Sequence, residues 1–488
     1  MLRRKIIGIA LFLFLLLALS HSFVQFSVMR LDGDIAESVL PYPDVQKTFD
    51  DPTGIKTIIN NDKHVGANRF FSHYFLHKTF RELPFLLQNF CNPIDSVYYT
   101  SAIAKLIMLI MLLFLFTVII NGKTNVFSLK FIVTVALLIP FFQINGRHLY
   151  HEIGIIDRSV TYSFFYAMPL IFLLSYYVPI FLEFLHDKKN KMNWILIILW
   201  GIFAIISCFS SPIIPPTILI TNVILFFYIF VRNWKANKGQ FFLRKVFNAF
   251  KIIPGRIYWF LLPISFLALY SLFLGTYNDA FSAVQLPLKD LYLLLPKGIL
   301  RTFTFTSYSI ITGMLVMNYL IIFYKYKGAP QYKKIVGLYR FLIVFSVIYV
   351  LLLPLGGYRS YRPYILRYDT IIPITVLSII TVCYTFLFIV KQLKTDKWKY
   401  HLKTIYLSTF FIIFIFLLYK NKLHVCNECE KSSLHTMAQL KEDVVVLDSD
   451  CCVISWEQID NQQYSKAYAE LIYFWNITDK VKLYYNSQ

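Results

Sequence analysis

Long apolar runs separated by short polar connections dominate the chain. Many of the runs approach or exceed the roughly 20 residues that an α-helix needs to cross the hydrocarbon core of a bilayer. They are too long and too closely spaced for the strands of a membrane β-barrel, and helices satisfy their own backbone groups in lipid. We therefore predict an α-helical polytopic membrane protein with about eleven spans, near residues 6–29, 101–121, 128–144, 160–184, 193–210, 213–231, 256–276, 306–325, 338–355, 370–390 and 403–419.

The composition supports this interpretation, because 57% of the residues are hydrophobic and only 15% are charged. The formal net charge of +21 could indicate a nucleic-acid partner. Lys and Arg retained in the cytoplasmic loops of a membrane protein produce the same excess, however. We therefore expect membrane lipids and no nucleic acid as partners.

The connections between spans alternate in charge. One set is rich in Lys and Arg: Arg3 to Lys5, Lys123 and Lys130, Lys188 to Lys191, Arg232 to Arg256, Lys325 to Arg340, and Lys391 to Lys403. The other set is sparse and carries Arg147 and Arg158, Lys289 to Arg301, and Arg359 to Arg367. The positive-inside rule places the first set and the N-terminus in the cytoplasm, and the C-terminus outside it. Richness in Asn, Lys and Ile favours a bacterial inner membrane.

Four regions follow from this topology. Residues 1–29 form a first transmembrane helix that acts as a signal anchor, although a cleavage site after Ala18-Leu19-Ser20 is an alternative. Residues 30–100 form an extracytoplasmic loop, in which the aromatic stretch 68–90 predicts an amphipathic helix along the membrane surface. Residues 101–420 hold ten more helices. Residues 421–488 form a small extracytoplasmic α/β domain, with a strand at 444–447 and a helix near 465–475.

Three carboxylates follow the first span directly: Asp32, Asp34 and Glu37. An Asp-X-Asp pair can direct two carboxylates at one small volume, where they hold a divalent cation such as Mg²⁺ or Mn²⁺, or act as a base and its partner. An isolated pair at a helix end more often only meets solvent. The use of a metal therefore stays open.

The place of this pair, in the first outside loop of a chain with surface helices and a trailing soluble domain, resembles the GT-C glycosyltransferases. The resemblance covers the whole layout but only a short motif. It implies an inverting transfer of sugar from a polyprenyl-phosphate donor to a glycan, lipid or protein acceptor, with Asp32 or Asp34 as the base and Glu37 in support. It also implies a further acidic residue from another outside loop, Glu152 or Asp157, whose plainer role is a loop salt bridge.

Three arginines in the loop before the tenth span oppose the charge rule: Arg359, Arg362 and Arg367. A guanidinium group matches phosphate oxygens through paired hydrogen bonds, so these residues are predicted to bind the lipid phosphate of the donor. Binding of anionic headgroups without specificity is the alternative. The tyrosines between the arginines fit an interfacial belt.

The last region contains four cysteines: Cys426, Cys429, Cys451 and Cys452. Because the topology places them in an oxidising compartment, we expect a disulfide between one of the first two and one of the last two. A zinc site is the alternative, but the vicinal pair is awkward for Cys-X-X-Cys ligation.

Two other functions remain open. An O-antigen-type polymerase or ligase also uses outside arginines near a lipid diphosphate, although its main loop usually lies late in the chain. A transporter or flippase calls for charged or broken helices at mid-membrane. The spans contain few such charges, but Pro212, Pro215 and Pro216 interrupt one hairpin.

Overall fold

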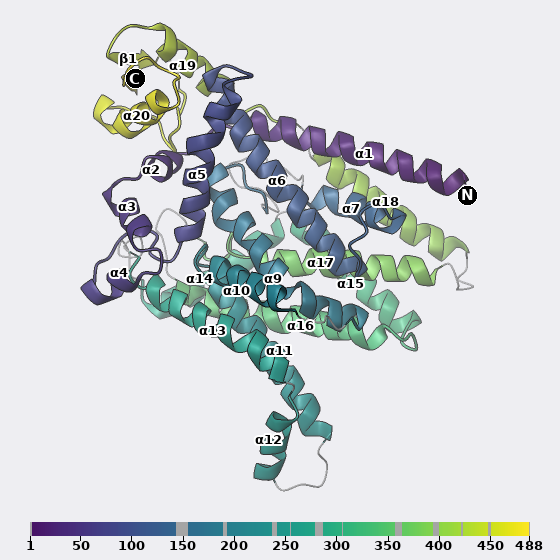
Figure 1. Cartoon of the computed structure of the whole chain (residues 1–488). Helices are drawn as coiled ribbons and strands as arrows, with labels where there is room; N and C mark the ends of the chain where they lie inside the picture. Colours follow the sequence, from purple (N-terminus) through teal and green to yellow (C-terminus); the bar gives the residue numbers. More distant parts are fainter. Residues whose placement is uncertain are drawn as a thin grey trace. The chain divides into compact units, whose positions relative to one another are not determined.

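The computed structural model describes residues 2–142, 155–188, 193–236, 242–253, 255–278, 286–304, 306–356, 364–393, 400–420, 423–447 and 450–487. Within these residues the chain is mostly helical and contains one sheet of two strands (Figure 1). The chain divides into two compact units. The first contains Met1–Pro52, Phe70–Ile171 and Val390–Gln488, and the second contains Thr53–Arg69 and Phe172–Ile389.

Nine helices in the described part of the chain are long and apolar enough to cross a membrane. They are α1 (Leu2–Ser27), α6 (Pro93–Asn121), α9 (Met168–His186) with the preceding α8 (Val160–Tyr162) and π-helical η1 (Ser163–Ala167), α11 (Ile214–Ala236), α13 (Gly255–Gly275), α15 (Thr306–Lys325), α16 (Tyr332–Leu352) with η3 (Leu353–Gly356), α17 (Ile372–Gln392) and α18 (Tyr400–Lys420). Two shorter apolar helices are α7 (Leu129–Phe142) and α10 (Trp194–Cys208).

Each predicted apolar run overlaps one of these nine helices or one of the two shorter ones. The helical polytopic class is therefore confirmed. The count of eleven spans stays a prediction, because α7 has 14 residues and α10 has 15, fewer than the roughly 20 that an untilted span uses.

The start and end of α6 show why a helix forms over these residues. The Asn92 side chain accepts a hydrogen bond from the backbone N–H of Asp95 at 2.8 Å and caps the first turn. Pro93 occupies the first helical position, where its fixed φ is favourable and no N–H is needed. Gly122 ends the helix in the left-handed conformation. From Ala102 to Ile120 the helix contains one charged residue, Lys105.

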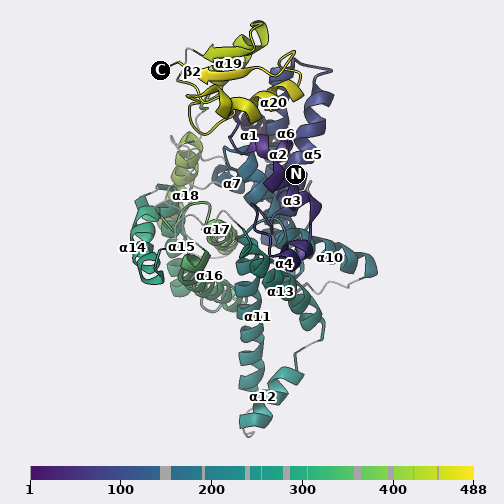
Figure 2. The same cartoon turned by 90° about the vertical axis from the view of Figure 1, so that its left-hand side faces the viewer.

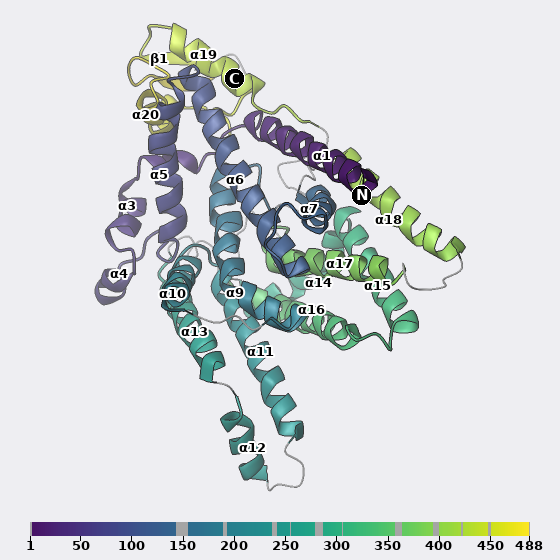
Figure 3. The same ribbon diagram turned by 45° about the vertical axis from the view of Figure 1, so that its right-hand side comes forward.

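In the first unit, α1, α6 and α7 pack against one another, and α18 packs against α7 (Figure 3). The segment after α1 forms α2 (Ile35–Val39) and α3 (Pro43–Asp50), and both pack on α5 (Phe70–Leu87). The predicted amphipathic helix is therefore present as α5, with one buried stripe made of Ser72, His73, Leu76, Phe80 and Pro84. Its orientation along a membrane surface stays a prediction.

The C-terminal part of the first unit is a small α/β domain. It consists of α19 (Glu428–Gln439), β1 (Val444–Leu447), η4 (Gln462–Ser465), α20 (Lys466–Phe474) and β2 (Leu483–Asn486). The predicted strand and helix are present, whereas α19 and β2 were not predicted. The strands pair in parallel, and such a pair needs a crossover connection, which contains α20. The domain docks on α5 through Trp475, which is buried and donates its indole N–H to the Phe80 carbonyl at 3.0 Å.

In the second unit, α11 packs against α10, α13 and α16, and α12 (Phe242–Lys251) lies beside the end of α11 (Figure 2). The unit also contains α4 (Ile55–Asn60) and α14 (Leu288–Thr304). The sequence pattern left the residues of α14 in a connection, because Lys289, Lys297 and Arg301 interrupt its apolar positions. The helix forms nevertheless, with Pro296 inside it, and packs against α15 and η3.

Candidate active site

Asp32 lies between α1 and α2 and is buried, with 3% of the residue exposed. Its Oδ2 accepts hydrogen bonds from the Ser159 hydroxyl at 2.7 Å and from the Thr161 backbone N–H at 3.1 Å. Its Oδ1 is also buried but has no hydrogen-bond partner within the described residues. Buried polar atoms of native proteins are almost always paired. The unpaired oxygen therefore marks Asp32 as a group suited to accept a proton from a bound hydroxyl.

The Ser159 hydroxyl is held in place by a compact turn before α8. The Asp157 Oδ1 accepts the Ser159 backbone N–H at 2.9 Å, and the Ser159 Oγ accepts the Tyr162 backbone N–H at 3.1 Å. Asp157 is itself buried. The structure thus brings Asp157 close to Asp32, with Ser159 between them. Glu152, the other acidic candidate of this loop, lies outside the described residues.

Lys105 of α6 is the buried cation of the site, with 1% of the residue exposed. It interacts electrostatically with both Asp157 and Asp32. Its Nζ donates a hydrogen bond to the Arg158 carbonyl and lies 3.7 Å from the Met29 sulfur. The cluster therefore combines two buried carboxylates with one buried ammonium group. Sequence analysis missed Lys105, although a charge inside an apolar run is by default a sign of function.

Asp34, the second residue of the acidic pair, is half-buried and has a different environment. Its Oδ1 accepts the indole N–H of Trp456 at 2.8 Å, and the indole stacks on Tyr162 with a centroid separation of 5.6 Å. Asp34 is thus held by the C-terminal domain. Glu37 lies on the exposed side of α2, where desolvation by neighbouring atoms and then repulsion from Asp44 raise the pKa of its carboxyl. The structure gives Glu37 no contact with Asp32.

Gly33 fits tightly against Trp456. A Cβ at Gly33 would lie 2.7 Å from the Trp456 Cδ1 and 2.8 Å from the Trp456 backbone nitrogen. Gly33→Ala should therefore destabilise the protein by about 1–3 kcal/mol, as overpacking does, measured as a lower thermal midpoint in detergent. Gly201→Ala is the matched control, because Gly201 lies in α10 with nothing within 4 Å of its Cβ position. Equal stability of both variants would contradict the close packing of Trp456 on Gly33.

Glu430 of α19 is a buried carboxylate that binds the segment before Asp32. Its Oε2 accepts the Leu31 backbone N–H at 3.0 Å and the Tyr98 hydroxyl at 2.7 Å. Its Oε1 accepts the Ile454 backbone N–H at 2.8 Å. Burial raises the pKa of Glu430 from 4.5 to about 7, and the three hydrogen bonds and Arg30 oppose that rise only in part.

This raised pKa predicts a pH-dependent stability. Because the folded protein binds the Glu430 proton more tightly than the unfolded chain does, the contribution is fully present below about pH 4.5 and is lost as the pH rises to about 7. The difference is about 3 kcal/mol. We expect the thermal midpoint in detergent to fall between pH 5 and pH 8. The fall should be smaller in Glu430→Gln, and an equal fall in the variant would assign it to other groups.

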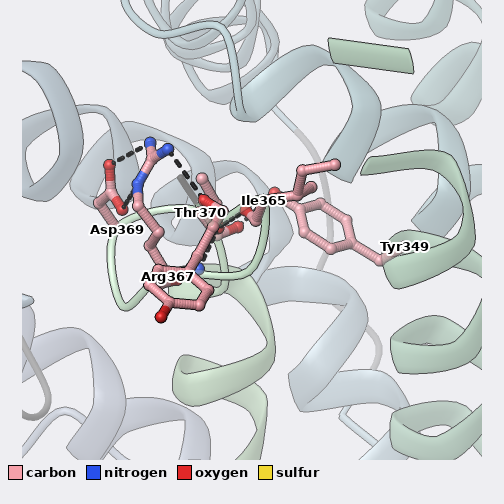
Figure 4. Close-up of polar contacts among 6 residues, drawn as sticks. Tyr349, Ile365, Arg367, Asp369 and Thr370 are labelled. Atoms are coloured by element: carbon pink, nitrogen blue, oxygen red, sulfur yellow. Dashed lines mark hydrogen bonds and ion pairs between the residues drawn. The ribbon is translucent and has the colours of Figure 1, made fainter. Parts of the chain in front are cut away.

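Of the three arginines predicted to bind a lipid phosphate, the structure describes only Arg367. Its Nε and one terminal nitrogen each donate to an Asp369 carboxylate oxygen at 2.9 Å, and Thr370 holds the same turn (Figure 4). Arg367 thus has an internal partner in the second unit. Arg359 and Arg362 lie outside the described residues.

The cysteines of the C-terminal domain are joined in part. Cys429 and Cys451 form a disulfide, with a Cα–Cα distance of 5.9 Å, while Cys426 and Cys452 are free thiols. Within the described residues, no group of three or more His, Cys, Asp or Glu side chains is arranged as metal ligands. Asp32 and Asp34 alone fit an Mg²⁺ or Mn²⁺ ion only if water and a substrate phosphate supply the other ligands.

The site is assembled from four separate parts of the first unit: the segment after α1, the lysine of α6, the turn before α8 and the C-terminal domain. Glu430 and Trp456 could not be found from the sequence, because an acidic residue in a polar segment and a tryptophan near a cysteine pair carry no signal of function. Chemically, the arrangement offers a buried base with a counter-charge beside it. Comparison of the chain with protein-family models, with curated proteins and with solved structures finds no match.

Proposed function

We propose that the chain is a membrane glycosyltransferase that moves a sugar from a polyprenyl-phosphate donor to a hydroxyl group of a glycan, lipid or protein acceptor. The observation that carries the proposal is the environment of Asp32, whose Oδ2 is fixed by Ser159 and Thr161 and whose buried Oδ1 has no partner in the described part of the chain. Such a carboxylate is oriented for proton transfer. The resemblance of the layout to GT-C glycosyltransferases points to the same residue.

In the proposed reaction, Asp32 accepts the proton of the acceptor hydroxyl, and the oxygen attacks the anomeric carbon of the donor sugar. The bond from that carbon to the phosphate oxygen breaks, and polyprenyl phosphate leaves with the electron pair. Attack from the face opposite the phosphate inverts the anomeric configuration. A positioned base of this kind typically contributes about 10²–10⁴-fold to the rate.

Positive charge is needed in two places. Lys105 supplies it next to the base, where it balances part of the charge of the two buried carboxylates. For the donor phosphate, Arg359 and Arg362 are the proposed ligands, because guanidinium groups bind phosphate oxygens in pairs. Arg367 is a weaker candidate for this role, since Asp369 already binds its guanidinium group.

We further propose that α7 and α10 complete eleven spans, with the N-terminus in the cytoplasm and the C-terminal domain outside a bacterial inner membrane. The alternation of Lys and Arg between connections supports this orientation. The disulfide Cys429–Cys451 is consistent with an oxidising compartment. A glycan acceptor and a lipid-linked donor would both be accessible on that side.

A proton-coupled carrier is the second candidate function. The observation in its favour is Lys105 itself, a buried charge inside a spanning helix with two acidic partners, which is the arrangement of many proton relays. The π-helical turn η1 follows the acidic turn and α8 directly, and such turns are frequent at functional sites.

The test uses the full chain, purified in detergent. It is mixed with radiolabelled sugars linked to undecaprenyl phosphate or undecaprenyl diphosphate, with short glycans or water as acceptors, in Mg²⁺, Mn²⁺ or EDTA. We expect sugar transfer or release by the wild-type protein, loss of turnover in Asp32→Asn and weaker donor binding in Arg362→Ala. Movement of the lipid-linked sugar across proteoliposomes without any bond cleavage would instead favour the carrier.

A further inference from the structure

Two residues of the C-terminal domain reach the short segment that contains Asp32, one on each side of it. On the N-terminal side, Glu430 accepts the backbone N–H of Leu31 at 3.0 Å. On the C-terminal side, Trp456 donates its indole N–H to Asp34 at 2.8 Å. Glu430 and Trp456 are separated from this segment by about four hundred residues of sequence. Only the folded structure brings them into contact with it.

Trp456 also joins this segment to the turn that holds the Asp32 carboxylate. Its indole ring packs on Gly33, which has no side chain to keep it away. The ring also stacks on Tyr162, with an interplanar angle of 24°. Tyr162 directly follows Thr161, whose backbone N–H binds the Asp32 Oδ2. One side chain therefore contacts both chain segments that orient Asp32.

The two contacts are linked within the C-terminal domain. Cys429 precedes Glu430 in α19, and its disulfide partner Cys451 lies in the segment that continues to Ile454 and Trp456. Ile454 donates its backbone N–H to the second oxygen of Glu430 at 2.8 Å. The two residues that touch the acidic segment are thus connected by a covalent bond and a buried hydrogen bond, so they form one rigid support.

We propose that Trp456 and Glu430 are positioning residues of the active site, and that Asp34 serves as the attachment point for Trp456 and not as the base. This inference rests on the proposed function, in which Asp32 is the base. The C-terminal domain then has a direct role in the active site. It holds the backbone on both sides of Asp32 while Ser159 and Thr161 hold its carboxylate.

Trp456→Phe tests the role of the indole N–H. Phenylalanine keeps an aromatic ring beside Gly33 and Tyr162 but cannot donate to Asp34. We expect kcat for transfer from undecaprenyl-phosphate-linked sugar to fall about 10- to 100-fold, as misplacement of a catalytic group does, while KM for the donor and the thermal midpoint change little. Trp259→Phe is the matched control. Trp259 is exposed in α13 of the second unit, so this variant should leave kcat and the thermal midpoint unchanged.

The two roles for Asp34 predict different kinetics. Asp34→Asn keeps an oxygen that can accept the indole N–H and should lower kcat by about tenfold or less, whereas a lost base would cost about 10²–10⁴-fold. Asp34→Ala should match Trp456→Phe, and the double variant should be no slower than either single variant, because both remove the same contact. Near-complete inactivity of Asp34→Asn would overturn the assignment.

A spectroscopic measurement separates this inference from the proposed function. The protein contains 7 tryptophans. Labelling with 5-fluorotryptophan gives each of them a ¹⁹F signal, and the signal that is missing in Trp456→Phe belongs to Trp456. We expect this ¹⁹F signal to shift in Asp34→Ala and to stay in place in Asp50→Asn, whose exposed carboxylate lies on α3. If no sugar transfer is found but the signal shifts, the proposed function fails and the contact stands. A signal insensitive to Asp34→Ala overturns the inference whatever the activity.

Discussion

Asp32→Asn is expected to abolish sugar transfer, with kcat lowered by about 10³-fold or more, while the protein folds and inserts normally. The amide oxygen can accept the same hydrogen bonds from Ser159 and Thr161 that the Asp32 Oδ2 accepts. The amide nitrogen takes the place of the unpaired Oδ1 and cannot accept a proton. The loss should therefore lie in kcat, at the upper end of what a general base contributes, and donor binding should persist. Single-turnover kinetics with a radiolabelled donor would measure both.

Asp50→Asn provides the control for this experiment. Asp50 ends α3 in the same region of the chain, and its exposed carboxylate accepts a hydrogen bond from the Gln46 side-chain amide at 2.8 Å. It should leave kcat and the thermal midpoint unchanged. Transfer retained by Asp32→Asn would remove Asp32 as the base, and a loss accompanied by aggregation on size-exclusion chromatography would show that the residue is needed for folding instead.

The spanning helices could be predicted from the sequence because the bilayer demands a continuous apolar run, which is a local property. The apolar run predicted at 370–390 corresponds to α17 (Ile372–Gln392), and the run predicted at 403–419 corresponds to α18 (Tyr400–Lys420). The helix α14 escaped prediction because its lysines and its proline break the apolar run, and its helical form depends on packing against α15 and η3. The strand β2, with 4 residues, is too short to be recognised without its partner β1.

The candidate site was predictable only where its signal is local. Asp32 and Asp34 stand next to the end of the first apolar run, where an acidic pair is conspicuous. Asp369 lies two residues from Arg367, so their ion pair could have been read from the sequence, and it weakens the phosphate role given to that arginine. The contacts of Glu430 and Trp456 with residues 31 and 34 join opposite ends of the chain, and no pattern in one sequence indicates such pairs.

The location of Lys105 explains how the carboxylates of Asp32 and Asp157 can both be buried. A lone ionised carboxylate loses its hydration on burial, at a cost of several kcal/mol, and two such groups close together also repel each other. Lys105 interacts with Asp157 and Asp32 and is anchored by the Arg158 carbonyl. The charge inside α6 and the two carboxylates of the adjoining loops are therefore one structural feature, and Asp32, the proposed base, depends on the lysine for its environment.

Lys105→Met is accordingly expected to destabilise the protein by about 3–5 kcal/mol, because removing one partner of a buried charge cluster leaves the others uncompensated. Methionine fills a similar volume, so the loss would reflect charge more than packing. Adding Asp157→Asn should recover part of the loss, since the double variant has one buried carboxylate fewer, and the coupling between the two changes should be about 1–3 kcal/mol. Lys130→Met, at an exposed lysine of α7, should have an effect within about 0.5 kcal/mol. Equal stability of Lys105→Met and Lys130→Met would mean that the carboxylates do not rely on the lysine, and the electrostatic basis of the site would have to be abandoned.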